Sequence, residues 1–109
     1  DTLFSLGCGR IFEGTYEQMF NSLQLLKSFP EDTKIYCGHE YTLKNSEFCI
    51  KHDKNNSALI EKIESIKEKL QKGFSTVPST IKEELDCNIF LRSKDVKSFS
   101  KLRDLKDKF

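Results

Sequence analysis

Strand-forming sequence is confined to the first 41 of the 109 residues, and the apolar spacing of the remainder is helical. The first strand signal covers residues 1–5 and runs into Gly7-Cys8-Gly9, where glycine permits the backbone conformations of a tight loop. The second signal covers residues 33–37, is β-branched and aromatic, and stops at Gly38. These patterns predict an α+β fold with two short strands near the start and helices thereafter.

Helix starts are marked by capping residues. Thr15 with Gln18, and Thr80 with Glu83, have the capping-box spacing, in which each side chain bonds the other residue's backbone N–H. Apolar residues at helical spacing follow Thr15 as far as Phe29. Helices are also predicted over residues 42–52, over 56–71 and from Asp95 to the end of the chain, the last two from the helical spacing of their apolar residues.

Composition excludes several classes of protein. Eighteen Lys and Arg against 17 Asp and Glu give a net charge of +1, and nine Phe with three Tyr supply core material. The chain is therefore neither disordered nor a general binder of nucleic acid. No apolar run approaches the ~20 residues that span a bilayer, and no charged segment followed by an apolar one, as in a signal peptide, occurs in these residues. We expect no membrane partner and a cytoplasmic location.

The cysteines contain no pair at the spacing of a zinc ligand motif. Cys8, Cys37, Cys49 and Cys87 are far apart in sequence, and a chain of this size can form a core without disulfides. Free, buried thiols are therefore predicted for all four cysteines.

Two residues at strand ends are candidates for metal chemistry. His39 follows the second strand signal, where a loop can aim an imidazole into a cleft, and Asp1 stands at the edge of the first. His39-Glu40 does not begin a zincin helix, because Leu43 occupies the place of its second histidine. Two ligands are too few for a catalytic metal. We therefore expect further ligands upstream, in a longer protein (the parent protein) of which this chain is a part.

The end of the chain is basic. Residues 90–109 carry seven Lys and Arg and three Asp, a local charge of +4, which leaves −3 for residues 1–89. This pattern is typical either of a solvated helix surface or of a site for an acidic small molecule.

Several motifs together carry a family resemblance. In order along the chain they resemble the C-terminal part of glyoxalase II, hydroxyacylglutathione hydrolase, within the metallo-β-lactamase superfamily. The motifs are Asp1-Thr2-Leu3-Phe4, Gly7-Cys8-Gly9-Arg10, Phe12-Glu13-Gly14-Thr15, Cys37-Gly38-His39-Glu40-Tyr41-Thr42, Thr76-Val77-Pro78-Ser79-Thr80 with Glu83-Glu84, and Asn88-Ile89-Phe90-Leu91-Arg92.

The resemblance implies a fold and an activity. Residues 1–41 would be the C-terminal remnant of a metallo-β-lactamase-like αββα sandwich, and residues 42–109 a helical domain that binds glutathione. The parent protein would hydrolyse S-(2-hydroxyacyl)glutathione thioesters, such as S-D-lactoylglutathione, in methylglyoxal detoxification. It would use a binuclear metal centre that this chain holds only in part, with zinc expected and iron or manganese as alternatives.

The resemblance also implies roles for particular residues. Asp1 matches the carboxylate that bridges the two metal ions, and His39 matches a ligand of the second ion. The remaining matches are to residues that contact glutathione: Arg10, Tyr41, and the pair Arg103 and Lys106, which would bind a carboxylate.

Two alternatives remain open. One is another enzyme of the superfamily, such as a persulfide dioxygenase or a lactonase, and Arg103 with Lys106 argues against it. The other is a non-catalytic helical interaction module, which needs neither metal nor anion site. We expect the parent protein to be monomeric. We expect this chain alone to be inactive and to self-associate.

Overall fold

The computed structural model, described for residues 2–11 and 14–109, contains five α-helices and two two-stranded antiparallel sheets. The predicted mixture of helices and short strands is therefore confirmed. The helices are α1 (Tyr16–Lys27), α2 (Thr42–His52), α3 (Ser57–Gln71), α4 (Ile81–Cys87) and α5 (Val96–Asp107).

The helix boundaries follow from local sequence. Thr15 and Thr80 cap α1 and α4, and both capping boxes form as predicted. Asn56 caps α3 by accepting from the Leu59 N–H, and Asp95 caps α5 by accepting from the Ser98 N–H. These bonds satisfy backbone donors that a helix leaves unpaired at its first turn.

The first sheet is a hairpin of β1 (Leu3–Phe4) and β2 (Gly7–Cys8), with Leu3 opposite Cys8 and Phe4 opposite Gly7. The predicted loop at residues 7–9 is therefore wrong, because the chain reverses earlier, at Ser5 and Leu6. Leu6 has φ 60°, a left-handed conformation that is costly for a residue with a Cβ. Its N–H donates to Glu84 Oε1 at 2.7 Å, so a distant residue stabilises this turn.

The second sheet pairs β3 (Lys34–Ile35) with β4 (Ser79–Thr80). β3 lies within the strand predicted over residues 33–37 but is shorter. The expectation of no strand after Tyr41 is wrong, because Ser79 and Thr80 form β4. A two-residue strand has no sequence period of its own. This one depends on its partner, and the Ile81 N–H extends the pairing by donating to the Thr33 carbonyl at 3.0 Å.

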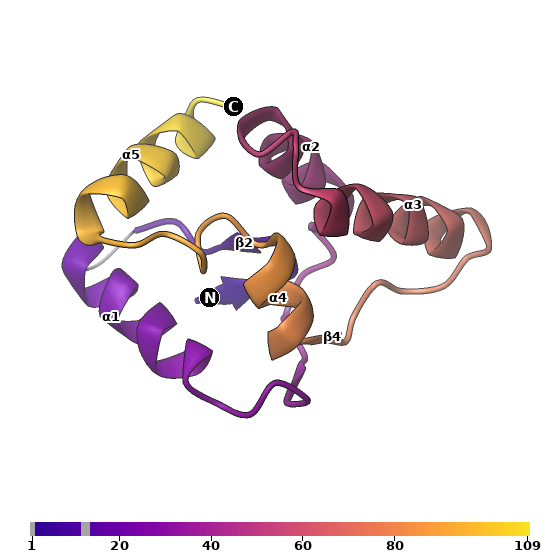
Figure 1. Ribbon diagram of the computed structural model, residues 1–109, viewed down its shortest axis with the longest axis horizontal. Coiled ribbons are helices and arrows are strands. Elements are labelled where there is room, and N and C mark those ends of the chain that lie inside the picture. The colour runs from indigo at the N-terminus through magenta and orange to yellow at the C-terminus, as the bar shows by residue number, and fades with distance from the viewer. Residues whose placement is uncertain (1, 12–13) are drawn as a thin grey trace.

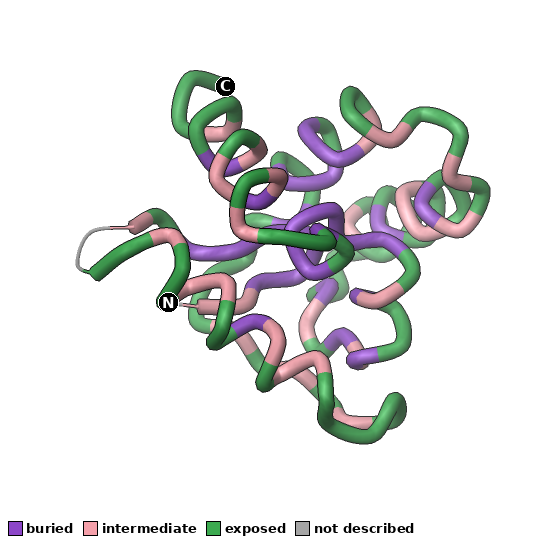
Figure 2. The backbone as a smooth tube through the Cα atoms, turned by 60° about the vertical axis from the view of Figure 1, so that its left-hand side comes forward, coloured by how far each residue is buried: buried purple, intermediate pink, exposed green. Residues whose placement is uncertain are grey.

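The helices surround the hairpin. Figure 1 shows α1 beside α5 on one side, α2 beside α3 on the other, and α4 between them, in agreement with the contacts between these elements. Figure 2 shows the buried segments gathered at the centre and the exposed ones at the outer turns. Three phenylalanine rings line up in the core, with centroids 5.8 Å apart for Phe48 and Phe90 and 6.2 Å apart for Phe90 and Phe99.

One cluster of buried side chains includes residues from both sides of the predicted domain boundary at residues 41 and 42. Leu6 and Leu23 precede it, and Phe48 and Phe99 follow it. The boundary stays a prediction.

All four cysteines are free, as predicted. Cys8, Cys49 and Cys87 are buried as expected, but the predicted burial is wrong for Cys37, which is half-buried.

Among the described residues, no helix has both the length and the apolar character needed to cross a membrane.

Candidate functional site

A cavity of about 410 Å³ opens where the hairpin, the start of α2 and the end of α5 meet. This volume lies in the range of small-molecule sites, which is about 300–1,000 Å³. Phe4, Cys8 and Gly9 contribute from the hairpin and the residue after it, and Asn45 from α2. The remaining lining residues are charged or aromatic: Arg10, Tyr41, Lys44, Arg103 and Lys106.

Gly7 leaves room for the Asn45 side chain of α2 against the hairpin, beside this cavity. A Cβ at residue 7 would lie 2.6 Å from Asn45 Nδ2, inside van der Waals contact. The Asn45 amide in turn donates to the Ser5 carbonyl at 3.2 Å. A side chain at residue 7 would therefore displace the Asn45 side chain, whose hydrogen bond joins the first turn of α2 to the hairpin.

The structure brings together all four residues that the resemblance assigns to glutathione. Arg10, Tyr41, Arg103 and Lys106 lie far apart in sequence, yet all line the one cavity. Their contact with a ligand stays a prediction, and their environments differ.

Arg103 is buried, with 3% of its surface exposed, and its guanidinium is largely committed to protein groups. Nη1 donates to the carbonyls of Cys8, at 2.7 Å, and Gly9, at 3.2 Å, and Nη2 donates to Asp107 Oδ1 at 3.0 Å. The guanidinium carbon lies 5.3 Å from the centroid of the Phe90 ring. Nε has no hydrogen-bond partner in the described part of the chain. Arg103 therefore anchors α5 to the end of the hairpin and is not part of a solvated face.

Lys106 lies one turn further along α5 and is half-buried. Its Nζ is 5.9 Å from the ring centroid of Phe48 and 5.8 Å from that of Phe109, so two aromatic rings flank the ammonium. Burial lowers the pKa of Lys106, and the nearby positive charges of Arg103, Lys44 and Arg10 lower it further. Repulsion among these positive side chains indicates that a bound anion would stabilise their charged forms.

The charges around the cavity are unbalanced. Four cations line it, and none of its described lining residues is a carboxylate. Asp107, beside the cavity, pairs with Arg10 at 3.7 Å and with Arg103 at 3.0 Å. Among the described residues, one paired carboxylate against four cations leaves an excess of positive charge, which suits an anionic small molecule.

His39 lies beside the cavity. Its ring stacks on Tyr41, with centroids 4.8 Å apart and an interplanar angle of 10°, and meets Phe4 edge-on at 5.8 Å. Tyr41 is thus the link between the predicted metal ligand and the cationic cavity. Asp1, the other predicted ligand, lies outside the described residues.

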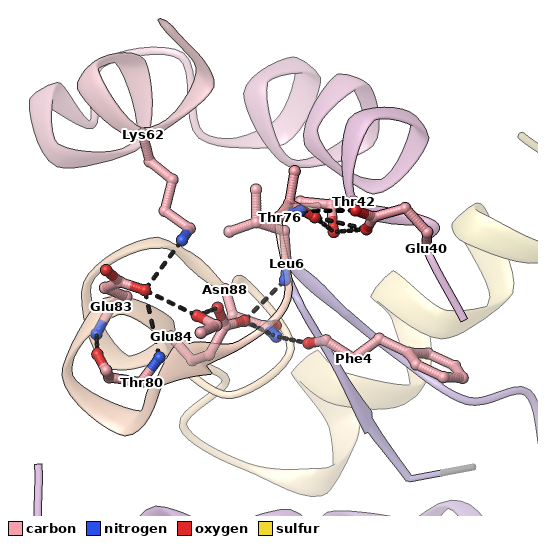
Figure 3. Close-up of polar contacts among 11 residues, drawn as sticks. Phe4, Leu6, Glu40, Thr42, Lys62, Thr76, Thr80, Glu83, Glu84 and Asn88 are labelled. Atoms are coloured by element: carbon pink, nitrogen blue, oxygen red, sulfur yellow. Dashed lines mark hydrogen bonds and ion pairs between the residues drawn. The ribbon is translucent and has the colours of Figure 1, made fainter. Parts of the chain in front are cut away.

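Glu40 secures the loop that carries His39 and Tyr41. Its carboxylate accepts hydrogen bonds from the Thr76 N–H at 2.6 Å, the Thr42 hydroxyl at 3.0 Å and the Thr76 hydroxyl (Figure 3). It also accepts from the Ser75 hydroxyl at 3.1 Å. Burial alone would raise the pKa of Glu40, but the hydrogen bonds from Thr76, Thr42 and Ser75 together outweigh it and lower the pKa. The loop is thereby tied to the segment before β4.

A second buried network supports the hairpin side of the cavity. Glu84 is fully buried and accepts from the Leu6 N–H, the Ser79 hydroxyl at 2.6 Å and the Asn88 amide at 3.0 Å (Figure 3). Asn88 also donates to the carbonyls of Phe4, at 3.3 Å, and Gly7, at 3.0 Å. The turn of the hairpin is therefore held by α4 and the residue that follows it.

The described residues do not by themselves hold a metal ion. No group of three or more His, Cys, Asp or Glu side chains lies close enough together within residues 2–11 and 14–109. Three protein ligands are the usual minimum for a catalytic zinc.

The buried thiols are not poised as nucleophiles. Burial raises the pKa of Cys8 and Cys87 to about 11 and that of Cys49 to about 12. Thiols with such pKa values stay protonated at neutral pH, and the thiolate is the reactive form.

Comparison with known families shows which family has residues that match those of the cavity. The family described as hydroxyacylglutathione hydrolase C-terminus matches residues 40–109. The chain belongs to the hydroxyacylglutathione hydrolase family. The matched residues include Tyr41, Lys44, Arg103 and Lys106 of the cavity.

Proteins named hydroxyacylglutathione hydrolase resemble the whole chain. The protein of Pelagibacter ubique (strain HTCC1062) is 69% identical over 109 residues, which cover 100% of this chain and 46% of that protein. The proteins of Prochlorococcus marinus (strain NATL1A) and Methylococcus capsulatus (strain ATCC 33009 / NCIMB 11132 / Bath) are 47% and 42% identical, with 100% of this chain and 43% and 48% of theirs covered. The chain thus spans about half the length of these hydroxyacylglutathione hydrolases.

Three residues of the site were not predicted from the sequence. Lys44 and Asn45 line the cavity, and Glu40 holds its loop. Lys44 could have been found, because it lies three residues after Tyr41 at a predicted helix start and so falls on the same face. Nothing in the sequence links Glu40 to Thr76, since the two are 36 residues apart.

Proposed function

We propose that this chain is the C-terminal part of an enzyme that hydrolyses S-(2-hydroxyacyl)glutathione thioesters, such as S-D-lactoylglutathione, to glutathione and a 2-hydroxy acid. The observation that carries the proposal is the cationic cavity, which combines four positive side chains with Tyr41 in a chain of this family. Glutathione has two carboxylates, so such a cavity has the charge to bind it.

Within this proposal, the cavity binds the glutathione part of the substrate. Lys106 meets the glycine carboxylate beside Arg103, whose guanidinium lines the same cavity. Arg10, at the rim, adds a further charge, and the Tyr41 ring lies along the thiol side of the ligand. The acyl group then points toward His39, which is stacked on Tyr41.

We propose that His39 and Asp1 are ligands of a binuclear metal centre, with zinc expected and iron or manganese as alternatives. Its other ligands would come from the part of the parent protein that this chain does not match. The chemistry that such a centre supplies when bound is polarisation of a carbonyl group and activation of water at neutral pH. This chain's own residues bind and orient the thioester beside it.

The proposal extends to the architecture of the parent protein. Residues 1–41, with β1, β2, α1 and β3, would belong to a metallo-β-lactamase-like αββα sandwich. Residues 42–109 would be the helical glutathione-binding domain, which adds β4 to the edge of β3. A cytoplasmic enzyme of methylglyoxal detoxification is the corresponding biological role.

The test is an assay of the purified parent protein. We expect hydrolysis of S-D-lactoylglutathione that is lost after treatment with a chelator and restored by added zinc. Turnover that is insensitive to chelator, or no turnover with any glutathione thioester, would contradict the proposal. Lactones and glutathione persulfide serve as comparison substrates, and a preference for either would favour another enzyme of the superfamily.

A further inference from the structure

Lys44 is a cavity residue to which the resemblance gives no role. It lies in the first turn of α2, three residues after Tyr41, and lines the same cavity as the other cations. Its side chain is exposed, and its ammonium has no ion pair or hydrogen bond with any residue that the structure describes. The charge is therefore available to a ligand.

The other cations of the cavity are partly occupied. Arg103 donates to two carbonyls and to Asp107, and Arg10 pairs with the same aspartate. The two lysines of the cavity, Lys106 and Lys44, have no ion-pair partner among the described residues. They come from different walls of the cavity, Lys106 from α5 and Lys44 from α2.

Two available cations on two walls match a ligand with two separate anionic groups. If Lys106 and Arg103 bind one carboxylate, that contact leaves Lys44 without a counter-charge. The cavity also lies at the N-terminus of α2, where the helix dipole adds positive potential.

We propose that Lys44 is a specificity-determining residue that contacts the second carboxylate of the glutathione moiety, that of the γ-glutamyl residue. This inference rests on the proposed function. Because the contact forms in the bound substrate and persists in the transition state, it acts on binding and not on the chemical step.

The experiment uses the parent protein and two thioesters. One is S-D-lactoylglutathione, and the other is the lactoyl thioester of N-acetylcysteinylglycine, which keeps the glycine carboxylate and lacks the γ-glutamyl one. For Lys44→Ala we expect KM for the glutathione thioester to rise about fivefold, the size of a partly exposed ion pair, with kcat unchanged. KM for the truncated thioester should stay the same. Lys106→Ala should raise KM for both.

Two matched variants control for charge and folding. Lys44→Arg keeps the positive charge and should restore most of the affinity. Lys67→Ala removes an exposed lysine from α3, outside the cavity, and should change neither KM nor the thermal unfolding midpoint. The unfolding midpoint of Lys44→Ala should equal that of the wild type, because Lys44 is exposed.

A binding measurement separates this inference from the proposed function. Calorimetry with S-methylglutathione, which cannot be hydrolysed, should give a weaker Kd for Lys44→Ala by the same factor, whether or not the protein turns over thioesters. Lys44-dependent binding without turnover would overturn the proposed activity and retain the contact. The Lys44 contact is overturned if Lys44→Ala behaves like Lys67→Ala, if it affects both thioesters equally, or if the parent protein does not bind S-methylglutathione.

Discussion

Glu84 is a buried carboxylate on which the turn of the hairpin depends. Its Oε1 accepts from the Leu6 N–H at 2.7 Å and from Asn88 at 3.0 Å, and its Oε2 accepts from Ser79. Burial raises the pKa of Glu84, and the hydrogen bonds from Ser79, Leu6 and Asn88 only partly offset this effect. The folded protein therefore binds the Glu84 proton more tightly than the unfolded chain does.

This raised pKa predicts a pH dependence of stability. Glu84 contributes stability at pH values below its ordinary pKa of 4.5, and that contribution is lost as the pH rises through the folded-state pKa. Glu84→Gln keeps one carbonyl oxygen for Leu6 and Asn88 and can donate to Ser79, so its stability should fall less between pH 4 and 8 than that of the wild type. Urea unfolding across this pH range measures the stability of the wild type and of Glu84→Gln.

Glu84→Ala is the informative contrast. It leaves the Leu6 N–H and the Asn88 amide buried without this acceptor, so we expect a loss of about 3 kcal/mol in the free energy of unfolding. Parallel pH profiles for wild type and Glu84→Gln would contradict the assigned pKa direction.

Arg103 combines an anchoring role with a place in the cavity. Arg103→Ala would leave the carbonyls of Cys8 and Gly9 without their donor, and we expect a loss of about 3 kcal/mol of stability together with a raised KM. Arg103→Lys should also lose stability, because an ammonium lacks the planar fork that reaches both carbonyls and Asp107. Thermal unfolding and thioester kinetics on the parent protein test both effects.

Lys106→Ala is the variant to compare with Arg103→Ala, because Lys106 lines the same cavity without anchoring the helix. Its ammonium makes no hydrogen bond to any described backbone carbonyl and is flanked by aromatic rings, so Lys106→Ala should raise KM with a much smaller change in unfolding midpoint. An Arg103→Ala protein as stable as the wild type would show that Arg103 is not an anchor.

At the scale of elements, Asn56 joins the start of α3 to the end of α4. Its Oδ1 accepts from the Leu59 N–H as the helix cap, and its Nδ2 donates to the Asp86 carbonyl at 2.7 Å. The same side chain thus stabilises one helix locally and links it to another.

Two substitutions at Asn56 separate these contributions. Asn56→Ser keeps a good cap and loses the bond to Asp86, so we expect a cost of about 1 kcal/mol. Asn56→Ala loses both, with an expected cost of about 2 kcal/mol. Urea unfolding of both variants gives the comparison, and equal losses would mean that the cap contributes nothing.

At the scale of the whole molecule, we expect the isolated chain to lack the activity that is proposed for the parent protein. The described residues offer no group of three metal-ligating side chains, and large apolar side chains are exposed, including Leu25 at 64%, Tyr36 at 72% and Phe74 at 63%. Surfaces of this kind favour association.

We therefore expect the 109-residue chain alone to hydrolyse no thioester, to bind less than one equivalent of zinc and to self-associate. Metal analysis after dialysis and sedimentation velocity measure these properties. A monodisperse monomer that retains stoichiometric zinc would contradict the prediction.

Local sequence determined where the helices begin. Thr15 with Gln18 and Thr80 with Glu83 bond within a single helical turn, and α3 follows the apolar spacing of residues 56–71. Caps and periodicity act between residues at most four apart, so they can be read without a structure. The cavity residues Arg10, Tyr41, Arg103 and Lys106 were also predictable, but from a family resemblance.

Only the tertiary structure decided the features that join distant segments. The left-handed turn at Leu6 depends on Glu84, 78 residues away, and β4 exists because Ser79 and Thr80 meet β3. The burial of Arg103 depends on the Cys8 carbonyl, 95 residues away. Each of these needs a donor and an acceptor that meet only when the core has formed, and such pairings leave no local pattern in the sequence.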